Sequence, residues 1–213
     1  MSSGTAGQGD SALCVAAPDQ EESLYAALCK QLAAERIIVL DKDDSPFCRV
    51  LDRALRILTF GKQDRFMSHY VTTLGKRIYV PKLWLRYKPG DRYLILRHEA
   101  VHVRQFRRLT WPGMTLVYLL LPLPMGLAGG RAWLEWQAYR ESIIATWQLR
   151  GPAAARDKSF TDDIVARFTS ADYAWMWLPG GQVRRWIDRL LADLEANPPP
   201  SLPTSRPQVS SIR

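Results

Sequence analysis

The sequence predicts a mainly helical α+β protein with a small antiparallel sheet and a central helix that carries the segment HEAVH. Three observations support this fold class. Apolar residues recur at helical spacing through most of the chain, and a β-branched and aromatic run at 66–80 is interrupted by Leu74-Gly75. The two histidines of HEAVH are four residues apart, which places them on one face of a helix.

The folded body is expected between residues 19 and 196, as a single domain. The segments 1–18 and 197–213 are rich in Ser, Gly and Pro, and they carry too little apolar surface to offset the entropy of ordering them. We therefore predict disorder at both ends. The chain opens without a secretory pattern, and its three scattered cysteines fit a reducing compartment, so we expect a cytoplasmic protein.

The hydrophobic periodicity predicts six helices, one buried strand and one β-hairpin, separated by Pro- and Gly-containing breaks. The expected elements are helix 20–35, strand 37–41, helix 45–61, hairpin 66–80, and helices 92–109, 131–149, 160–169 and 182–195. The helix 92–109 carries HEAVH, and an uncharged stretch at 110–130 separates it from the next helix.

The formal net charge of +8 comes mainly from arginines scattered through the chain. A basic balance of this kind favours acidic partners in general without choosing among them. Since no nucleic-acid reading motif accompanies the arginines, we expect no specific nucleic-acid binding. A DNA-associated protein with strongly salt-dependent affinity stays as a third hypothesis.

The histidine pair carries the clearest chemical signal in the chain. His98 and His102 project from one helix face about one turn apart, close enough to share one metal ion. Glu99 is rotated by about 100° from His98, so it can reach a water on that metal without binding the ion itself. The alternative is a pair of core histidines on a half-buried face, but only three histidines occur in the chain.

The segment HEAVH resembles the signature HExxH of the zincin metallopeptidases, which lies on a helix behind an edge strand. The resemblance extends from the hairpin to the helix after residue 131. It implies a zincin-like core, a Zn²⁺ ion held by His98 and His102, and Glu99 as the catalytic base. It also implies that 72–81 (TTLGKRIYVP) is the edge strand on which an extended polypeptide substrate pairs.

A catalytic zinc of this kind needs a third protein ligand and an open position for water. No histidine follows His102, so a carboxylate is expected. We predict Glu135, in WLEWQAY, because the gluzincin branch of the zincins takes its third ligand from a glutamate on the next helix. Glu141 and His69 are the alternatives.

The uncharged stretch 110–130 is long enough to span a bilayer, and arginines flank it. Its three prolines and the pair Gly129-Gly130 argue against one straight helix. A straight span would also place Glu135 roughly 30 Å from the histidines. We therefore predict a helical hairpin or broken helix, either packed over the core or inserted into one leaflet as a peripheral membrane contact.

The function predicted from these residues is that of a zinc-dependent metallohydrolase, most specifically a peptidase with Glu99 as general base. Tyr173, in the cluster YAWMW, and Tyr139 are candidate donors to the oxyanion. The alternative is a catalytically inactive zincin-like scaffold that binds a structural zinc and associates with a membrane or a protein partner.

Overall fold

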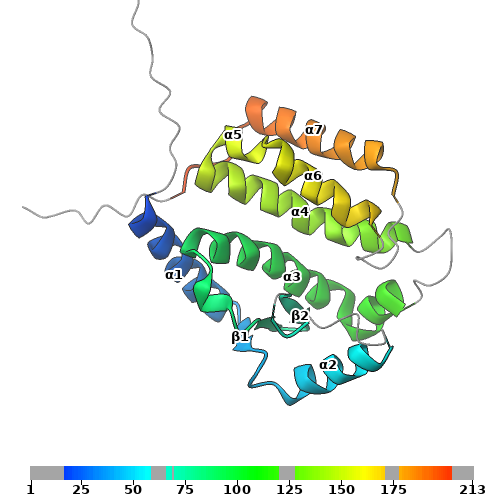
Figure 1. Cartoon of the computed structure of the whole chain (residues 1–213). Helices are drawn as coiled ribbons and strands as arrows, with labels where there is room; N and C mark the ends of the chain where they lie inside the picture. Colours follow the sequence, from blue (N-terminus) through cyan, green and yellow to red (C-terminus); the bar gives the residue numbers. More distant parts are fainter. Residues whose placement is uncertain (1–16, 59–65, 69, 120–127, 171–177, 203–213) are drawn as a thin grey trace, which may run out of the picture.

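The computed structural model describes residues 17–58, 66–68, 70–119, 128–170 and 178–202, and it is mainly helical with one small sheet (Figure 1). The elements are α1 (Pro18–Ala34), β1 (Ile38–Asp41), α2 (Pro46–Leu58), β2 (Thr72–Leu74), β3 (Arg77–Val80), η1 (Trp84–Arg86), α3 (Pro89–Leu119), α4 (Ala128–Arg150), α5 (Pro152–Ala155), α6 (Lys158–Thr169) and α7 (Gly180–Ala196). The mainly α, α+β class predicted from the sequence is therefore confirmed.

The sheet has three strands in the order β1-β3-β2, and it is mixed. β2 pairs antiparallel with β3 through a tight turn in which Gly75 has a φ of 60°, whereas β1 pairs parallel with β3. The prediction of an antiparallel sheet was wrong in this respect. The chain from β1 to β3 passes through α2, and a crossover of this length lets two strands run in the same direction.

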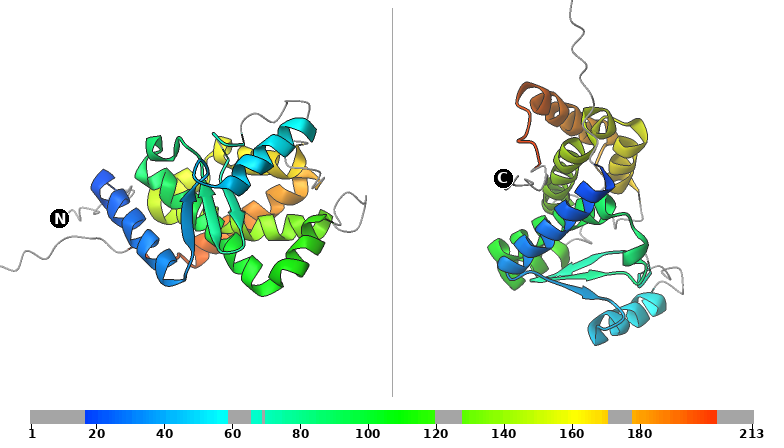
Figure 2. Two further views of the ribbon diagram at one scale, coloured as in Figure 1. Left: turned by 90° about the horizontal axis from the view of Figure 1, so that it is seen from below. Right: turned by 90° about the vertical axis from the view of Figure 1, so that its left-hand side faces the viewer.

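The central strand β3 packs against helices on both faces of the sheet, as the right-hand view of Figure 2 shows. Successive side chains of a strand point to opposite faces. Ile78 and Val80 join the core formed with α1 and α3. Tyr79 packs instead with Cys48 of α2 and with Phe66. The sheet thus lies between α2 and the helix that carries the histidines.

Polar contacts with α1 fix the position of α3. The backbone N–H of Gly90, in the first turn of α3, donates to Glu21 Oε2 at 3.1 Å, which satisfies one of the free amides of that helix end. Arg104, which lies nearly two turns after His98 along α3, donates to Glu35 Oε1 at 2.9 Å. Contacts at both ends therefore hold the motif-bearing part of α3 against α1.

The helices α3 and α4 pack side by side and run in opposite directions. Arg150, at the end of α4, donates to Asp91 near the start of α3 at 2.5 Å. Gln105, further along α3, donates to the carbonyl of Leu134 near the start of α4 at 2.9 Å. The chain therefore turns back between the two helices, and residues 120–127 of that turn lie outside the described residues.

A break at Thr110 divides α3 within the uncharged stretch. Thr110 has non-helical dihedral angles, with a φ of 59° and a ψ of 173°. Pro112 follows two residues later in the sequence, and a proline in a helix interior lacks the amide hydrogen that a continuous helix requires. No helix among the described residues is both long enough and apolar enough to cross a membrane.

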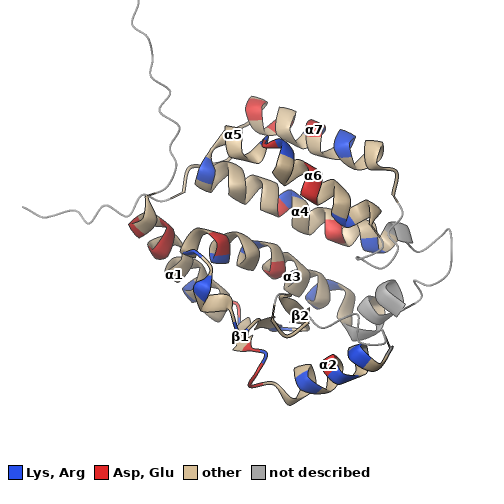
Figure 3. Cartoon of the chain, in the orientation of Figure 1, with Lys and Arg blue, Asp and Glu red and all other residues tan. Residues whose placement is uncertain are grey.

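The helices α5, α6 and α7 cover the far side of α4 and form a second core with it (Figure 1). The end of the described chain returns to the first core, where Leu202 packs and the Pro200 carbonyl accepts a hydrogen bond from Gln148 at 2.9 Å. Basic and acidic residues both occur along most of the helices (Figure 3). The interface between α3 and α4 thus has packed helices on either side.

Lys42, which follows β1, is fully buried. Its ammonium donates to the carbonyl of Phe66 at 2.7 Å and lies 3.7 Å from the centre of the Phe66 ring. Burial penalises the charged form and lowers the pKa of Lys42 to about 8. The folded protein therefore binds fewer protons than the unfolded chain between about pH 8 and pH 10.5.

This difference predicts that stability rises with pH in that window, because the unfolded state then binds the extra proton. Relative to a Lys42→Met variant, the wild-type free energy of unfolding should increase by roughly 3 kcal/mol between pH 7 and pH 10.5, as measured by urea denaturation. The exposed Lys82 provides the control, since Lys82→Met should follow the wild-type pH profile. The prediction would be contradicted if the free energies of unfolding of the wild type and Lys42→Met changed with pH in parallel.

Candidate metal centre

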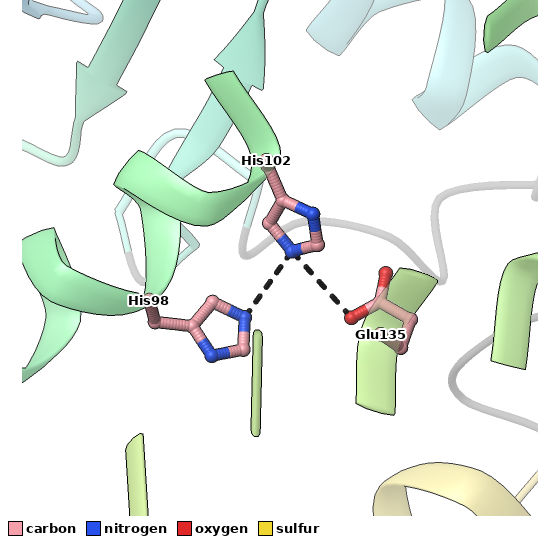
Figure 4. Close-up of side chains that lie close together, drawn as sticks. All are labelled: His98, His102 and Glu135. Carbon is pink, nitrogen blue, oxygen red and sulfur yellow. Dashed lines mark hydrogen bonds and ion pairs between the residues drawn. The ribbon is translucent and has the colours of Figure 1, made fainter. Parts of the chain in front are cut away.

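His98 and His102 of α3 and Glu135 of α4 come together at the interface between the two helices (Figure 4). The Nε2 atoms of the two histidines are 3.3 Å apart, and Glu135 Oε2 lies 3.6 Å from His102 Nε2. One ligand atom from each of the three side chains lies within 4.8 Å of the other two. The histidines come from adjacent turns of one helix, and the glutamate comes from the antiparallel neighbour.

Hydrogen bonds at Nδ1 determine which nitrogen of His98 is free. Nδ1 lies 3.0 Å from Ser142 Oγ, and the Ser142 hydroxyl donates its own hydrogen to the carbonyl of Ala138 at 3.2 Å. The hydroxyl oxygen therefore accepts from His98 Nδ1–H. With its proton on Nδ1, neutral His98 presents an unprotonated Nε2.

The same logic applies to His102, whose Nδ1 lies 2.9 Å from Gln105 Oε1. The Gln105 amide nitrogen donates to the carbonyl of Leu134 at 2.9 Å and to Gln137 Oε1 at 3.2 Å. These two acceptors identify the other amide atom as oxygen, which accepts from His102 Nδ1–H. The lone pair of His102 Nε2 therefore also points toward the centre.

Two imidazole lone pairs and a carboxylate thus converge, an arrangement that a cation stabilises. His102 and Glu135 are buried, with exposed fractions of 8% and 9%. Burial lowers the pKa of His98 to about 3, so the ring is neutral at physiological pH, as a metal ligand must be. A tetrahedral zinc ion with bonds of about 2.05 Å separates two ligand nitrogens by about 3.3 Å. The residues present therefore fit a zinc ion.

Glu99 lies beside this group and faces the sheet. Thr73, in β2, donates from its hydroxyl to Glu99 Oε2 at 2.5 Å. Burial raises the pKa of Glu99 above its usual value, and the nearby carboxylate of Glu135 acts in the same direction. The carboxylate is therefore held between the motif helix and the strand β2.

A cavity of about 320 Å³ opens next to His98 and Glu99, between α3, α4 and α6. Its apolar wall is formed by Leu94, Ile95, Phe160 and Ile164, and its polar lining includes Tyr139, Ser142, Thr146, Asp163 and Arg167. The ring of Tyr139 also packs edge-on against His98, with the ring centres 4.8 Å apart. The site therefore has an adjoining space of the size of an amino-acid side chain or larger.

Among the predicted site residues, Glu141 is separated from the metal-binding group. It accepts from Arg97 Nε at 2.6 Å, and the described three-residue group contains Glu135 instead. His69 and Tyr173 lie outside the described residues. Glu135 is thus the predicted carboxylate that the fold places beside His102.

Sequence reasoning missed Ser142 and Gln105, the hydrogen-bond partners of the two imidazoles, and the contact from Thr73 to Glu99. A signal for the first two was present. Ser142 follows Glu135 by seven residues and Gln105 follows His102 by three, so each shares a helix face with a ligand. The Thr73 contact depends on how the sheet docks on α3, and local spacing does not specify it.

Comparison of the chain with models of protein families, with curated proteins and with solved structures gave no match. Inference about function therefore depends on the site and its surroundings.

The Ser142 hydroxyl is expected to raise metal affinity by orienting His98. Ser142→Ala should weaken Zn²⁺ binding about 10- to 100-fold, the usual effect of removing such a partner, as measured by competition with a chromophoric chelator. Thr146, one turn further along α4 and in the same cavity, is the control, and Thr146→Val should bind with wild-type affinity. Equal affinities for wild type and Ser142→Ala would contradict the assigned role.

Proposed function

We propose that the chain is a zinc-dependent metallohydrolase that cleaves peptide bonds. The observation that carries this proposal is the convergence of two unprotonated Nε2 atoms and one carboxylate at 3.3 and 3.6 Å, with Glu99 adjacent. Three protein ligands leave a fourth tetrahedral position for water or substrate, which distinguishes catalytic from structural zinc sites. The oxygen and nitrogen donors also suit zinc in a hydrolase.

Zinc held by His98, His102 and Glu135 would supply Lewis-acid activation of a water molecule and of the substrate carbonyl. Glu99 acts as the general base that accepts the proton of the attacking water and then delivers it to the leaving amine. The hydrogen bond from Thr73 orients the Glu99 carboxylate for these transfers. Ser142 and Gln105 hold the two imidazole rings in the orientation that directs Nε2 inward.

The proposed substrate is an extended polypeptide, because the site lies beside a sheet edge. Among the described strands β2 pairs only with β3, and its other edge is the proposed place for backbone hydrogen bonds with a peptide. Thr73 of the same strand donates a hydrogen bond to Glu99, the proposed general base, which supports this orientation of the substrate. A peptide paired with β2 would therefore pass the general base.

The cavity next to the site would accept a substrate side chain. Its wall of Leu94, Ile95 and Ile164 favours an apolar group, while Arg167 and Asp163 provide polar contacts. Tyr139, which lines this cavity beside His98, is the proposed donor to the oxyanion.

Metal content tests the ligand set. Purified wild-type protein is expected to hold about one zinc per chain, because three ligands suffice for a catalytic site, and His98→Ala and Glu135→Ala should each lose it. Glu141→Gln is the matched control, since Glu141 pairs with Arg97, and it should retain zinc. Elemental analysis of the variants provides the measurement. Absence of zinc from metal-replete wild-type protein would refute the proposed metal centre.

Substitution of the proposed base separates catalysis from metal binding. Glu99→Gln should reduce hydrolysis of a fluorogenic peptide library about 100- to 10,000-fold, the usual contribution of a general base, while the zinc content stays the same. Thr73→Val, which keeps the carboxylate and removes only its hydrogen-bond donor, should cause a smaller loss. If the wild type holds zinc but hydrolyses no peptide, the result would support the alternative function, an inactive zinc-binding scaffold.

A further inference from the structure

The helix α2 exposes an apolar stripe on its outer side. Phe47, Val50 and Ile57 have exposed fractions of 47%, 65% and 75%, far above those of typical large apolar side chains in a folded protein. With Ala54 they follow one another at intervals of three, four and three residues, so they lie along one face of the helix. None of these four residues belongs to the proposed catalytic site.

The other faces of α2 have different roles. Cys48 is fully buried against Tyr79 and Phe66, so this side of the helix packs on the sheet. Arg49, Arg53 and Arg56 are also exposed, and helical spacing places them next to Val50 and Ile57. Basic positions recur along α2 in Figure 3. Because Arg56 is paired with Asp52 at 2.8 Å, Arg49 and Arg53 supply most of the positive charge. The solvent-facing surface of α2 therefore combines an apolar strip with adjacent positive charge.

We propose that this surface of α2 binds the headgroup region of an anionic lipid bilayer, with the helix axis parallel to the membrane. An interfacial helix needs an apolar strip that enters the acyl boundary and cations that contact acidic headgroups, and α2 presents both on adjacent faces. The helix has 13 residues, which corresponds to a contact about 20 Å long. The overall charge of +8 favours the same partner.

The charge pattern argues against a second copy of this chain as the occupant. A symmetric pair of α2 helices would bring two rows of arginines together, and that repulsion opposes association. Asp43 and Asp44 precede the helix, and Asp52 within it is buried and forms an ion pair with Arg56 at 2.8 Å. Asp43 lies 3.9 Å from Lys82, which partly offsets its charge. The contact is therefore expected to centre on the stretch from Val50 to Ile57.

Co-sedimentation of the full chain with phosphatidylcholine vesicles, with and without phosphatidylserine, tests this proposal. The wild type should pellet with the acidic vesicles, and binding should weaken as salt is raised. The double variant Val50→Ser, Ile57→Ser should bind at least about tenfold more weakly, since it removes the apolar contact. The double variant Arg49→Gln, Arg53→Gln should lose the salt-sensitive part of the binding, and it leaves the ion pair between Arg56 and Asp52 intact.

The matched control is Leu85→Ser, because Leu85 is 81% exposed but lies on η1 rather than on α2, and it should bind like the wild type. Thermal melting of every variant checks that the fold is intact. The proposal would be overturned if the wild type stayed in the supernatant with acidic vesicles at low salt, or if the serine double variant bound as tightly as the wild type. A lipid-free dimer that the double variant dissociates would identify a second copy as the occupant and would also overturn it.

Discussion

The antiparallel packing of α3 on α4 is the constraint on which the rest of the site depends. His98 and His102 are on one helix and Glu135 is on the other, so the three side chains meet only if the chain turns back between them. The same interface holds Arg97 against Glu141 and Gln105 against the carbonyl of Leu134. Leu96, Ala100 and Val103 of α3 share a core with Ala145 and Leu149 of α4. This close packing sets the register of the two helices, and the ligand geometry follows from it.

Electrostatics explains why this interface tolerates so many buried polar groups. A buried polar atom is costly unless it is hydrogen-bonded, and both imidazoles are bonded through Nδ1 to a neighbour on α3 or α4. As a consequence, the two unprotonated Nε2 atoms face each other and the carboxylate of Glu135. Without a cation this is unfavourable, and with one it is a preorganised set of ligands. The packing and the proposed chemistry are thus two consequences of the same hydrogen-bond network.

The sheet contributes to the site through its edge rather than its centre. β3 is the middle strand and serves mainly as core, with Ile78 and Val80 on one face and Tyr79 on the other. β2, at the edge, places Thr73 against Glu99. The parallel pairing of β1 with β3 was not predicted, because the pattern IIVLD indicates a buried strand but contains no information on the direction of its neighbour.

The sequence by itself determined the mainly helical class, the helix that carries HEAVH and the four-residue spacing of its histidines, because these depend on local periodicity. It also ranked Glu135 ahead of Glu141, although only through a resemblance. The tertiary structure decided that Glu135 approaches His102 while Glu141 pairs with Arg97. It also decided that Ser142, Gln105 and Thr73 complete the surroundings of the site. The contacts of His98 with Ser142 and of Thr73 with Glu99 join residues 44 and 26 positions apart, and local spacing does not specify them because they depend on how whole helices and strands pack.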